Sequence, residues 1–389
     1  MIRILFFTPL SLEYGRGGEL SIIELASGLE KYFDVTLIDT NRVIEKKVLD
    51  KRELYSKLSG LKKVSRFNYL TVKFLNKDLS IPKPIQILRL YKEINKVDIV
   101  YTSLYDIKTI LLLIIFRLLN RKIKIIIGFR KPLFSEKLFS IYNIKNRIAI
   151  LLLKIFKKNI YLHTISRYAK NYLDFFYKPN RVYHIIHAID LNDYLNVNNQ
   201  RKDKSMLNFL YVGHLDAIHK GIDILINAIR KILSENINLN IKFEFCGTGP
   251  LESEVKKLEK DFPNKVKAFG FIDHDKIAEY YMRNDVFLFT SRREPFGRVL
   301  IEALAAKLLI ICSKTYGSVE ILKNQEFAFF LKELNPINLS QEIKKVYSLW
   351  KTNPDKFYQL QDFAYNFAFK NYTFSKELDM FREFFKRLN

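Results

Sequence analysis

Cysteine is scarce in this sequence, with Cys246 and Cys312 the only two among 389 residues. Both lie within apolar runs, and no Cys-x-x-Cys spacing of the kind that binds zinc is present. This pattern argues against a disulfide-based or zinc-based scaffold. We expect two small core side chains in a protein of the reducing cytosol.

Long apolar runs are also missing. The longest, residues 110–119, contains Arg117 and is shorter than the ~20 residues that a membrane-spanning helix needs. Residues 2–7 are apolar, but Pro9 and Glu13 follow too soon for a secretory signal. We therefore expect a cytoplasmic protein without a membrane span, whose 48% hydrophobic residues fill the cores of two or three domains.

Acidic residues are few relative to basic ones, and the net charge is +24. The excess is concentrated in residues 1–200, which hold 35 Lys and Arg against 17 Asp and Glu, whereas the remainder holds 30 against 24. Such a field attracts anionic lipid head groups, phosphorylated substrates or nucleic acid, and does not choose between them. The alternative is that the charge has no functional cause, because a proteome rich in lysine and isoleucine raises the positive charge of all its proteins.

Short apolar runs alternate with longer helical patterns along the whole chain, which predicts an α/β protein with parallel sheets. The expected fold is two Rossmann-like domains facing each other across a cleft, with ligands beyond the carboxyl ends of the strands. The basic, weakly patterned segment 41–84 is expected to hold one or two exposed helices or a loop. The predicted boundaries are an N-terminal domain at 1–190, a linker at 191–205, a C-terminal domain at 206–370 and a last helix at 371–389 that packs back on the N-terminal domain.

The most informative string is S-R-R-E-P-F-G-R-V-L-I-E-A-L-A-A, at residues 291–306. It follows an apolar run and leads into a helical pattern near Gly297, so the first N–H groups of that helix would form an anion site. Glu294 lies on the loop and Glu302 lies eight residues later, inside the helix, where a carboxylate suits ribose hydroxyls. Two solvated glutamates on an ordinary helix are the alternative.

Three further glycine-containing loops follow apolar runs. In Y-V-G-H-L-D-A-I-H-K-G, at 211–221, Gly213 permits a tight turn and Lys220 offers a point charge for a phosphate. His214 and His219 are either additional phosphate contacts or exposed loop residues. The strings C-G-T-G-P, at 246–250, and Y-G-S-V-E, at 316–320, are either ligand-binding turns or simple turns between strand and helix.

Together these strings resemble the family-4 retaining glycosyltransferases of the GT-B fold, the glycosyl transferases group 1. Glu294 and Glu302 match the E-x7-E signature of that family, and the likeness covers about residues 205–325 but is faint over 1–190. The family usually has Arg at the position of His214. It also often has His where this chain reads G-F-R-K-P, at 128–132.

The resemblance implies transfer of a sugar from a nucleotide-sugar to a glycan or lipid-linked acceptor, with retention at the anomeric carbon. It implies no cofactor and no bound metal ion. The string G-R-G-G-E, at 15–19, resembles the Gly-Gly loop of the family, which lies beside the donor phosphates. The catalytic residues implied are Glu294, Lys220 and Arg16. The donor-binding residues implied are Gly17, Gly18, Gly213, His214, Gly247, Gly249, Phe296, Gly297, Arg298 and Glu302, and the acceptor-side residues are Arg130 and Lys131.

Residues 136–159 combine lysines and arginines with an apolar stripe, a pattern that suits a helix on an anionic membrane surface. The alternative is a core helix with lysines on its solvent face. We expect a peripheral location on the inner face of the cell membrane. Other functions consistent with the sequence are a glycosyltransferase acting on nucleic acid, a non-catalytic nucleotide-binding partner, and a GT-B epimerase or phosphorylase. A nucleic-acid partner is disfavoured because no basic motif with interleaved aromatic residues is present.

Overall fold

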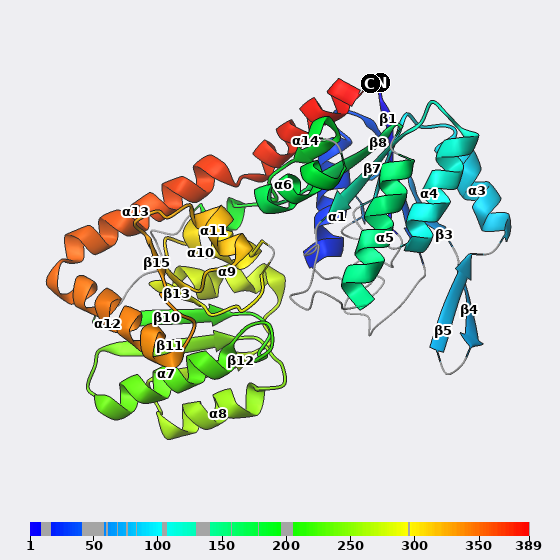
Figure 1. Ribbon diagram of the computed structural model, residues 1–389. Helices are drawn as coiled ribbons and strands as arrows, with labels where there is room; N and C mark the ends of the chain where they lie inside the picture. Colours follow the sequence, from blue (N-terminus) through cyan, green and yellow to red (C-terminus); the bar gives the residue numbers. More distant parts are fainter. Residues whose placement is uncertain are drawn as a thin grey trace. The chain divides into compact units, whose positions relative to one another are not determined.

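The computed structural model describes most of the chain, which forms two compact units (Figure 1). Unit 1 comprises residues 1–186 and 378–389, and unit 2 comprises residues 187–377. The described residues are 1–8, 17–40, 58–59, 61–67, 69–74, 77–82, 84–102, 107–129, 141–156, 158–177, 179–195, 205–294 and 296–388.

Unit 1 is built on a seven-stranded parallel sheet of order β3-β2-β1-β6-β7-β8-β9. Its central strands are continuous apolar runs, as expected of a sheet that helices cover on both faces. The strands are β1 (Arg3–Phe7), β2 (Asp34–Thr40), β3 (Val64–Phe67), β6 (Ile99–Thr102), β7 (Lys124–Phe129), β8 (Ile160–Thr164) and β9 (Val182–His184).

Alternate residues of β1 divide the core of unit 1 into two layers. Leu5 and Phe7 pack with the helices of one face, α3 (Pro84–Ile94), α4 (Ile107–Leu119), α5 (Ile141–Ile155) and α6 (Arg167–Phe176). Ile4 and Phe6 pack with α1 (Gly17–Leu29) and with α14 (Phe374–Leu388). The end of the chain thus returns to unit 1, where Phe381, Phe384, Phe385 and Leu388 enter the core.

The expectation of helices or a loop over 41–84 is wrong for residues 64–67, 69–74 and 77–82, which form strands. Here β3 extends the main sheet beside β2, and β4 (Tyr69–Phe74) pairs antiparallel with β5 (Lys77–Pro82). The alternation of polar and apolar residues in Y-L-T-V-K-F fits a strand, but the high basic content of the segment obscured it. Residues 41–57 lie outside the described part of the chain.

Unit 2 contains a six-stranded parallel sheet of order β12-β11-β10-β13-β14-β15. The first strand, β10, lies in the middle of this sheet. The next two strands, β11 and β12, extend the sheet to one edge, and β13, β14 and β15 extend it from β10 to the other edge, which is the Rossmann order. The switch point lies between β10 and β13. The strands are β10 (Leu207–Val212), β11 (Ile241–Cys246), β12 (Val266–Gly270), β13 (Val286–Phe289), β14 (Leu309–Cys312) and β15 (Ala328–Phe330).

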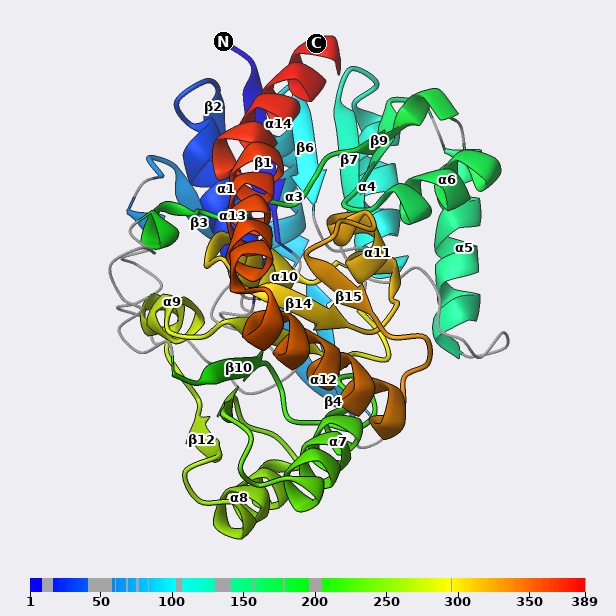
Figure 2. The same cartoon turned by 90° about the vertical axis from the view of Figure 1, so that its left-hand side faces the viewer.

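The helices of unit 2 form two groups. In one, α7 (Ile222–Glu235) packs against α8 (Glu252–Asp261) and α12 (Pro336–Thr352) (Figure 2). In the other, α10 (Arg298–Ala305) packs against α9 (His274–Met282), α11 (Tyr316–Leu322) and α13 (Pro354–Asn371). The two parallel sheets, each with helices between its strands, confirm the predicted α/β class.

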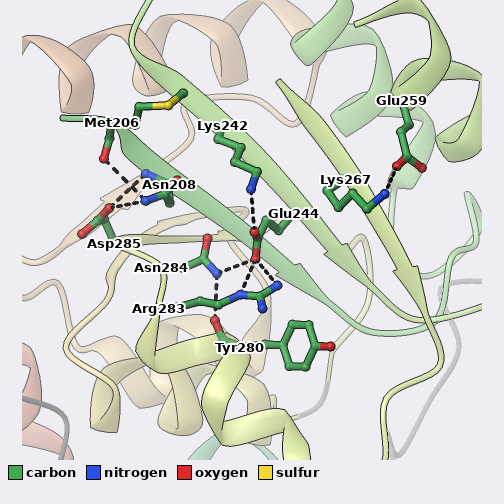
Figure 3. A network of polar contacts seen from close by, with 10 residues as sticks. All are labelled: Met206, Asn208, Lys242, Glu244, Glu259, Lys267, Tyr280, Arg283, Asn284 and Asp285. Atoms are coloured by element: carbon green, nitrogen blue, oxygen red, sulfur yellow. Dashed lines mark hydrogen bonds and ion pairs between the residues drawn. The ribbon is translucent and has the colours of Figure 1, made fainter. Parts of the chain in front are cut away.

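A buried carboxylate joins α9 to the sheet of unit 2 (Figure 3). Glu244 on β11 is 5% exposed and accepts hydrogen bonds from Arg283 Nε and Nη2 at 2.9 and 2.8 Å and from Asn284 Nδ2 at 3.0 Å. The Arg283 guanidinium also stacks over the rings of Phe269 and Tyr280. Because these partners satisfy the charge of the carboxylate, its burial is tolerated and the end of α9 is held in place.

Cys246 and Cys312 are both buried free thiols, as predicted. Ser166 is the N-cap of α6, where its hydroxyl oxygen accepts a hydrogen bond from Ala169 N at 3.2 Å. Among the helices in the described ranges, none has both the length and the apolar character needed to cross a bilayer.

Candidate active site

The loops that follow the strands of unit 2 gather at the carboxyl edge of its parallel sheet. The loops after β10 and β11 are joined backbone to backbone. Gly213 N donates to Cys246 O at 3.0 Å, and Leu215 N donates to Thr248 O at 2.9 Å. The two glycine-containing strings at 211–221 and 246–250 therefore form one continuous surface.

The glycines of the second of these loops are required by the close approach of the first. A Cβ on Gly247 would lie 1.9 Å from the carbonyl oxygen of Gly213, and Gly247 has a φ of +145°. A Cβ on Gly249 would lie 2.6 Å from the carbonyl oxygen of Leu215. Since backbone atoms cannot move aside as a flexible side chain can, a side chain at either position would separate the loops.

Lys220 and Glu294, which are 74 residues apart, meet at the switch point of the sheet. Lys220 Nζ lies 2.6 Å from Glu294 Oε2, and the two side chains are 26% and 15% exposed. Lys220 ends the loop after β10 and Glu294 lies on the loop after β13, the strands between which the winding reverses. Ligands of doubly wound sheets bind in the crevice at this point.

Several contacts fix the loop that carries Lys220. The Asp216 carboxylate accepts a hydrogen bond from His219 N at 2.6 Å, which closes the turn. Thr290 Oγ1 donates to Lys220 O at 2.9 Å, and Gly221, with a φ of +63°, has no room for a Cβ because it would lie 2.4 Å from Thr290 O. The loops after β10 and β13 are thus fastened together directly beneath the ion pair.

A second ion pair joins the same two loops farther out. Both Nη atoms of Arg292 donate to the Asp223 carboxylate at 2.8 Å, and Nη1 also donates to Ala217 O. The Arg292 hydrogen bonds hold the pKa of the Asp223 carboxyl below its usual value, and they raise the pKa of the guanidinium in turn. This bidentate contact adds geometric constraint to the site.

The helix after Glu294 begins where the string at 291–306 predicted. Gly297, with φ +96° and ψ +64°, is the N-cap of α10, and Arg298 is its first residue. Gly317 packs against the turn before it: its N–H donates to Glu294 O at 3.0 Å, and a Cβ there would lie 2.0 Å from Phe296 O. The start of α10 is therefore positioned by the first turn of α11.

Phe296 is 4% exposed and forms the underside of this loop. The imidazole of His187 packs against it, with ring centroids 5.5 Å apart. Glu377 in turn holds the His187 segment: its Oε2 accepts from Ala188 N at 2.8 Å and lies 3.5 Å from His187 Nδ1. These contacts connect the first and last residues of unit 2 to the loop that bears Glu294.

Glu302 lies in the second turn of α10, eight residues after Glu294. Its Oε2 accepts a hydrogen bond from the hydroxyl of Tyr281 on α9 at 2.9 Å. Of the predicted residues around it, Gly297 and Arg298 belong to the same helix start. His214 is exposed in the loop after β10, where the Tyr211 hydroxyl donates to its carbonyl oxygen at 3.0 Å.

Some predicted site residues cannot be placed in this way. Arg16, Arg130 and Lys131 lie outside the described residues, as does Pro295 of the central string. Gly17 and Gly18 are the first two residues of α1 in unit 1.

Sequence reasoning missed several residues that shape the site, among them Asp216, Asp223 and Tyr281. A signal existed for Asp216, because Asp commonly accepts a hydrogen bond from a backbone N–H two or three residues later in a turn. For Asp223 and Tyr281 no local signal existed, because their partners come from distant parts of the chain.

The sequence of unit 2 is similar to known glycosyltransferases. Residues 195–359 match the family model described as glycosyl transferases group 1. The chain is 32% identical over 150 residues to an uncharacterised glycosyltransferase of Methanocaldococcus jannaschii, covering 38% of this chain and 37% of that protein. It is 26% identical over 198 residues to a glycogen synthase of Thermodesulfovibrio yellowstonii, covering 46% and 39%. The matching segments span well under half the length of these relatives.

Solved structures extend the similarity of fold to the whole chain. A glycosyltransferase of Rickettsia africae has a TM-score of 0.72 at 19% identity and covers 100% of this chain and 98% of its own. The Anabaena protein HepE, in complex with UDP and glucose, has a TM-score of 0.72 at 17% identity and covers 99% and 100%. At these identities the match shows the GT-B fold alone.

Proposed function

We propose that this chain transfers a sugar from a nucleoside diphosphate sugar to a glycan or lipid-linked acceptor, because residues 195–359 match the family model of the glycosyl transferases group 1. The transfer retains the anomeric configuration and uses no resident metal ion. The observation that carries the proposal is the Lys220–Glu294 pair at the switch point of the unit 2 sheet, beside the start of α10.

The donor binds through three groups of unit 2. The diphosphate takes Lys220 as its counter-ion and receives N–H donors from the first turn of α10. Glu302, deeper in that helix, accepts hydrogen bonds from the ribose hydroxyls. The glycine-walled surface formed by the loops at 213–215 and 246–249 lets the nucleoside approach the backbone.

Chemistry takes place at the anomeric carbon, whose bond to the diphosphate oxygen breaks while the acceptor hydroxyl oxygen bonds on the same face and gives up its proton to the departing diphosphate. Negative charge then develops on the departing diphosphate, where Lys220 and the α10 N-terminus stabilise it. When the donor engages Lys220, the Glu294 carboxylate is released to orient the sugar hydroxyls and to offset positive charge at the anomeric centre. The resemblance assigns Arg16, Gly17 and Gly18 to the diphosphate and Arg130 and Lys131 to the acceptor.

A thermal-shift screen with nucleoside diphosphate sugars tests donor binding, since a ligand that binds the folded state raises the unfolding temperature. We expect one donor to stabilise the wild type, Glu302→Ala to abolish that stabilisation, and Glu294→Ala to abolish transfer. Glu259→Ala is the matched control, because Glu259 is an α8 carboxylate whose ion pair with Lys267 lies on the surface of the same unit. Near wild-type binding and transfer in both site variants would show that the assignment is wrong.

We propose that the acceptor is reached from an anionic membrane surface, through the outer faces of α4 and α5. These helices pack against each other on one face of the unit 1 sheet (Figure 1). Each exposes a stripe of large apolar side chains at helical spacing: Leu111, Ile115, Leu118 and Leu119 on α4, and Ile148, Leu151 and Ile155 on α5.

The charges around these stripes complement an anionic bilayer. Arg121, Arg147, Lys154 and Lys158 are exposed at or near the two helices. Glu136 is the one acidic residue in the sequence between positions 107 and 159. Exposed apolar side chains rimmed by cations are the features of a helix that lies in the interface of an anionic membrane.

Flotation with phosphatidylglycerol and with phosphatidylcholine vesicles tests this surface. We expect the protein to float with the anionic vesicles and to lose this binding in the double variant Ile115→Ser, Leu151→Ser. The control is Ile237→Ser, which removes an apolar side chain of similar exposure from unit 2. Equally weak binding to both kinds of vesicle, or anionic-vesicle binding that the double variant retains, would contradict the proposed membrane surface. Sedimentation experiments provide the other outcome: a dimer that the double variant abolishes would assign this face to a second copy of the chain.

A further inference from the structure

The carboxylate of Glu302 is held by a tyrosine that lies outside every motif in the sequence. Tyr281 on α9 is fully buried, and its hydroxyl donates to Glu302 Oε2 at 2.9 Å. A second buried ring, Tyr194 from the turn at Asn192–Tyr194, lies edge-on to Tyr281 with centroids 6.3 Å apart. Glu302 is thus anchored from the side of the core.

Both tyrosines remain neutral phenols at physiological pH. Burial raises the pKa of Tyr281 well above its usual value, and the negative charge of Glu302 raises it further. The pKa of Tyr194 is raised by the same two causes, partly offset by the charge of Arg298. The Tyr281 hydroxyl therefore remains a hydrogen-bond donor, and Glu302 Oε2 accepts that hydrogen bond.

A fixed donor on one oxygen sets the orientation of the whole carboxylate. The last torsion of a glutamate is broad and roughly two-fold, so without a partner the carboxylate plane samples many angles. A hydrogen bond to Oε2 from a rigid, buried ring removes most of that freedom. The second oxygen, Oε1, is then presented at a defined position, and a carboxylate has lone pairs enough to accept from two neighbouring hydroxyls.

We propose that Tyr281 is a positioning residue that aligns the Glu302 carboxylate with the ribose hydroxyls of the nucleotide, and thereby makes the site selective for ribose over deoxyribose. This inference rests on the proposed function, which assigns the ribose to Glu302. It adds that the selectivity depends on a hydroxyl that does not itself touch the substrate.

The test compares Tyr281→Phe with Tyr280→Phe in the full-length protein. Tyr280 is the neighbour on α9, and its ring packs edge-on against Phe269, so its variant also removes a hydroxyl from this helix. Calorimetry measures the Kd of the nucleoside diphosphate identified by the donor screen and of its 2′-deoxy and 3′-deoxy analogues. Unfolding temperatures without ligand, and kcat and KM for the donor, are measured for the same variants.

We expect Tyr281→Phe to weaken binding of the ribose form about tenfold, the size of one lost hydrogen bond to a charged group. Binding of at least one deoxy analogue should change little, so that the preference for ribose falls toward one. KM should rise while kcat stays within about threefold, because the reacting carbon is remote from Glu302. Tyr280→Phe should match the wild type, and in a Glu302→Ala background Tyr281→Phe should have no further effect on the preference for ribose.

Two results would overturn the inference. One is a Tyr281→Phe variant that retains the full preference for ribose. The other is equal weakening of the ribose and deoxy forms, which would mean that Tyr281 acts through the fold. A wild type that binds nucleoside diphosphates without preferring ribose overturns this inference and leaves the proposed transfer standing, whereas a wild type that binds none overturns both.

Discussion

Replacing Glu294 by Gln should separate binding of the diphosphate from transfer of the sugar. In the free protein Lys220 Nζ lies 2.6 Å from Glu294 Oε2, so an incoming diphosphate has to compete with this carboxylate for the lysine. Gln keeps the shape of the side chain but carries no charge. We therefore expect Glu294→Gln to bind a nucleoside diphosphate that lacks the sugar more tightly than the wild type does.

The size of the effect follows from the burial of the pair. Two unit charges 4 Å apart interact by about 4 kcal/mol at an effective dielectric constant of 20, whereas a fully exposed pair contributes roughly 0.2–1 kcal/mol. With side chains 26% and 15% exposed, the Lys220–Glu294 pair lies between these limits. An estimate of about 1–2 kcal/mol corresponds to binding that is about five- to thirtyfold tighter.

The same substitution should reduce transfer by roughly 10²–10³-fold, because a neutral amide does not offset positive charge at the anomeric carbon. Calorimetry with the nucleoside diphosphate and initial rates with its sugar conjugate measure the two effects separately. Lys220→Met should act in the opposite direction on binding, weakening the diphosphate by about tenfold or more. Glu235→Gln, which alters an ion-paired carboxylate on the surface of α7, is the control and should change neither. Weaker diphosphate binding together with preserved transfer in Glu294→Gln would refute the reasoning.

Three further predictions concern stability and reactivity. Glu244→Gln should destabilise the fold by about 1–3 kcal/mol in urea unfolding, because the buried side chain at position 244 loses the charge that pairs with Arg283 and Asn284, whereas Glu259→Gln on the surface should cost less than about 0.5 kcal/mol. Gly317→Ala should raise the donor KM at least about tenfold in steady-state kinetics, because its Cβ would lie 2.0 Å from a backbone oxygen of the Glu294 loop. Burial raises the pKa of Cys246 to about 12 and that of Cys312 well above its usual value, so an aromatic disulfide reagent at pH 8 should label neither thiol until the protein is unfolded.

The strands of unit 2 could be predicted closely because a parallel sheet covered on both faces needs continuous apolar runs. The apolar runs at 286–289 and 309–312 form β13 (Val286–Phe289) and β14 (Leu309–Cys312). The start of α10 was also predictable, because Gly297 stands between an apolar strand and a helical pattern. In each case the information is local to a few residues.

The pairing of Lys220 with Glu294 could not be predicted from local information. The motifs place each residue after a strand, but their contact depends on β10 lying next to β13, and strand order is a property of the whole sheet. Tyr281 presents the same difficulty in stronger form. Within the helix it is an ordinary aromatic residue, and it becomes part of the site only because α9 packs against α10.

The resemblance to known glycosyltransferases is concentrated at residues 205–325 for a reason that the contacts make visible. There Gly247, Gly249 and Gly317 touch backbone atoms of neighbouring loops at distances that exclude any side chain, so residue identity is dictated position by position. In α4 and α5 the fold requires only that every third or fourth residue, on the face toward the core, be apolar. Many sequences satisfy that requirement, and the outward-facing residues of these helices are free to vary. A C-terminal half that is recognisable by motif and an N-terminal half that is recognisable only by periodicity and charge are therefore what this architecture should produce.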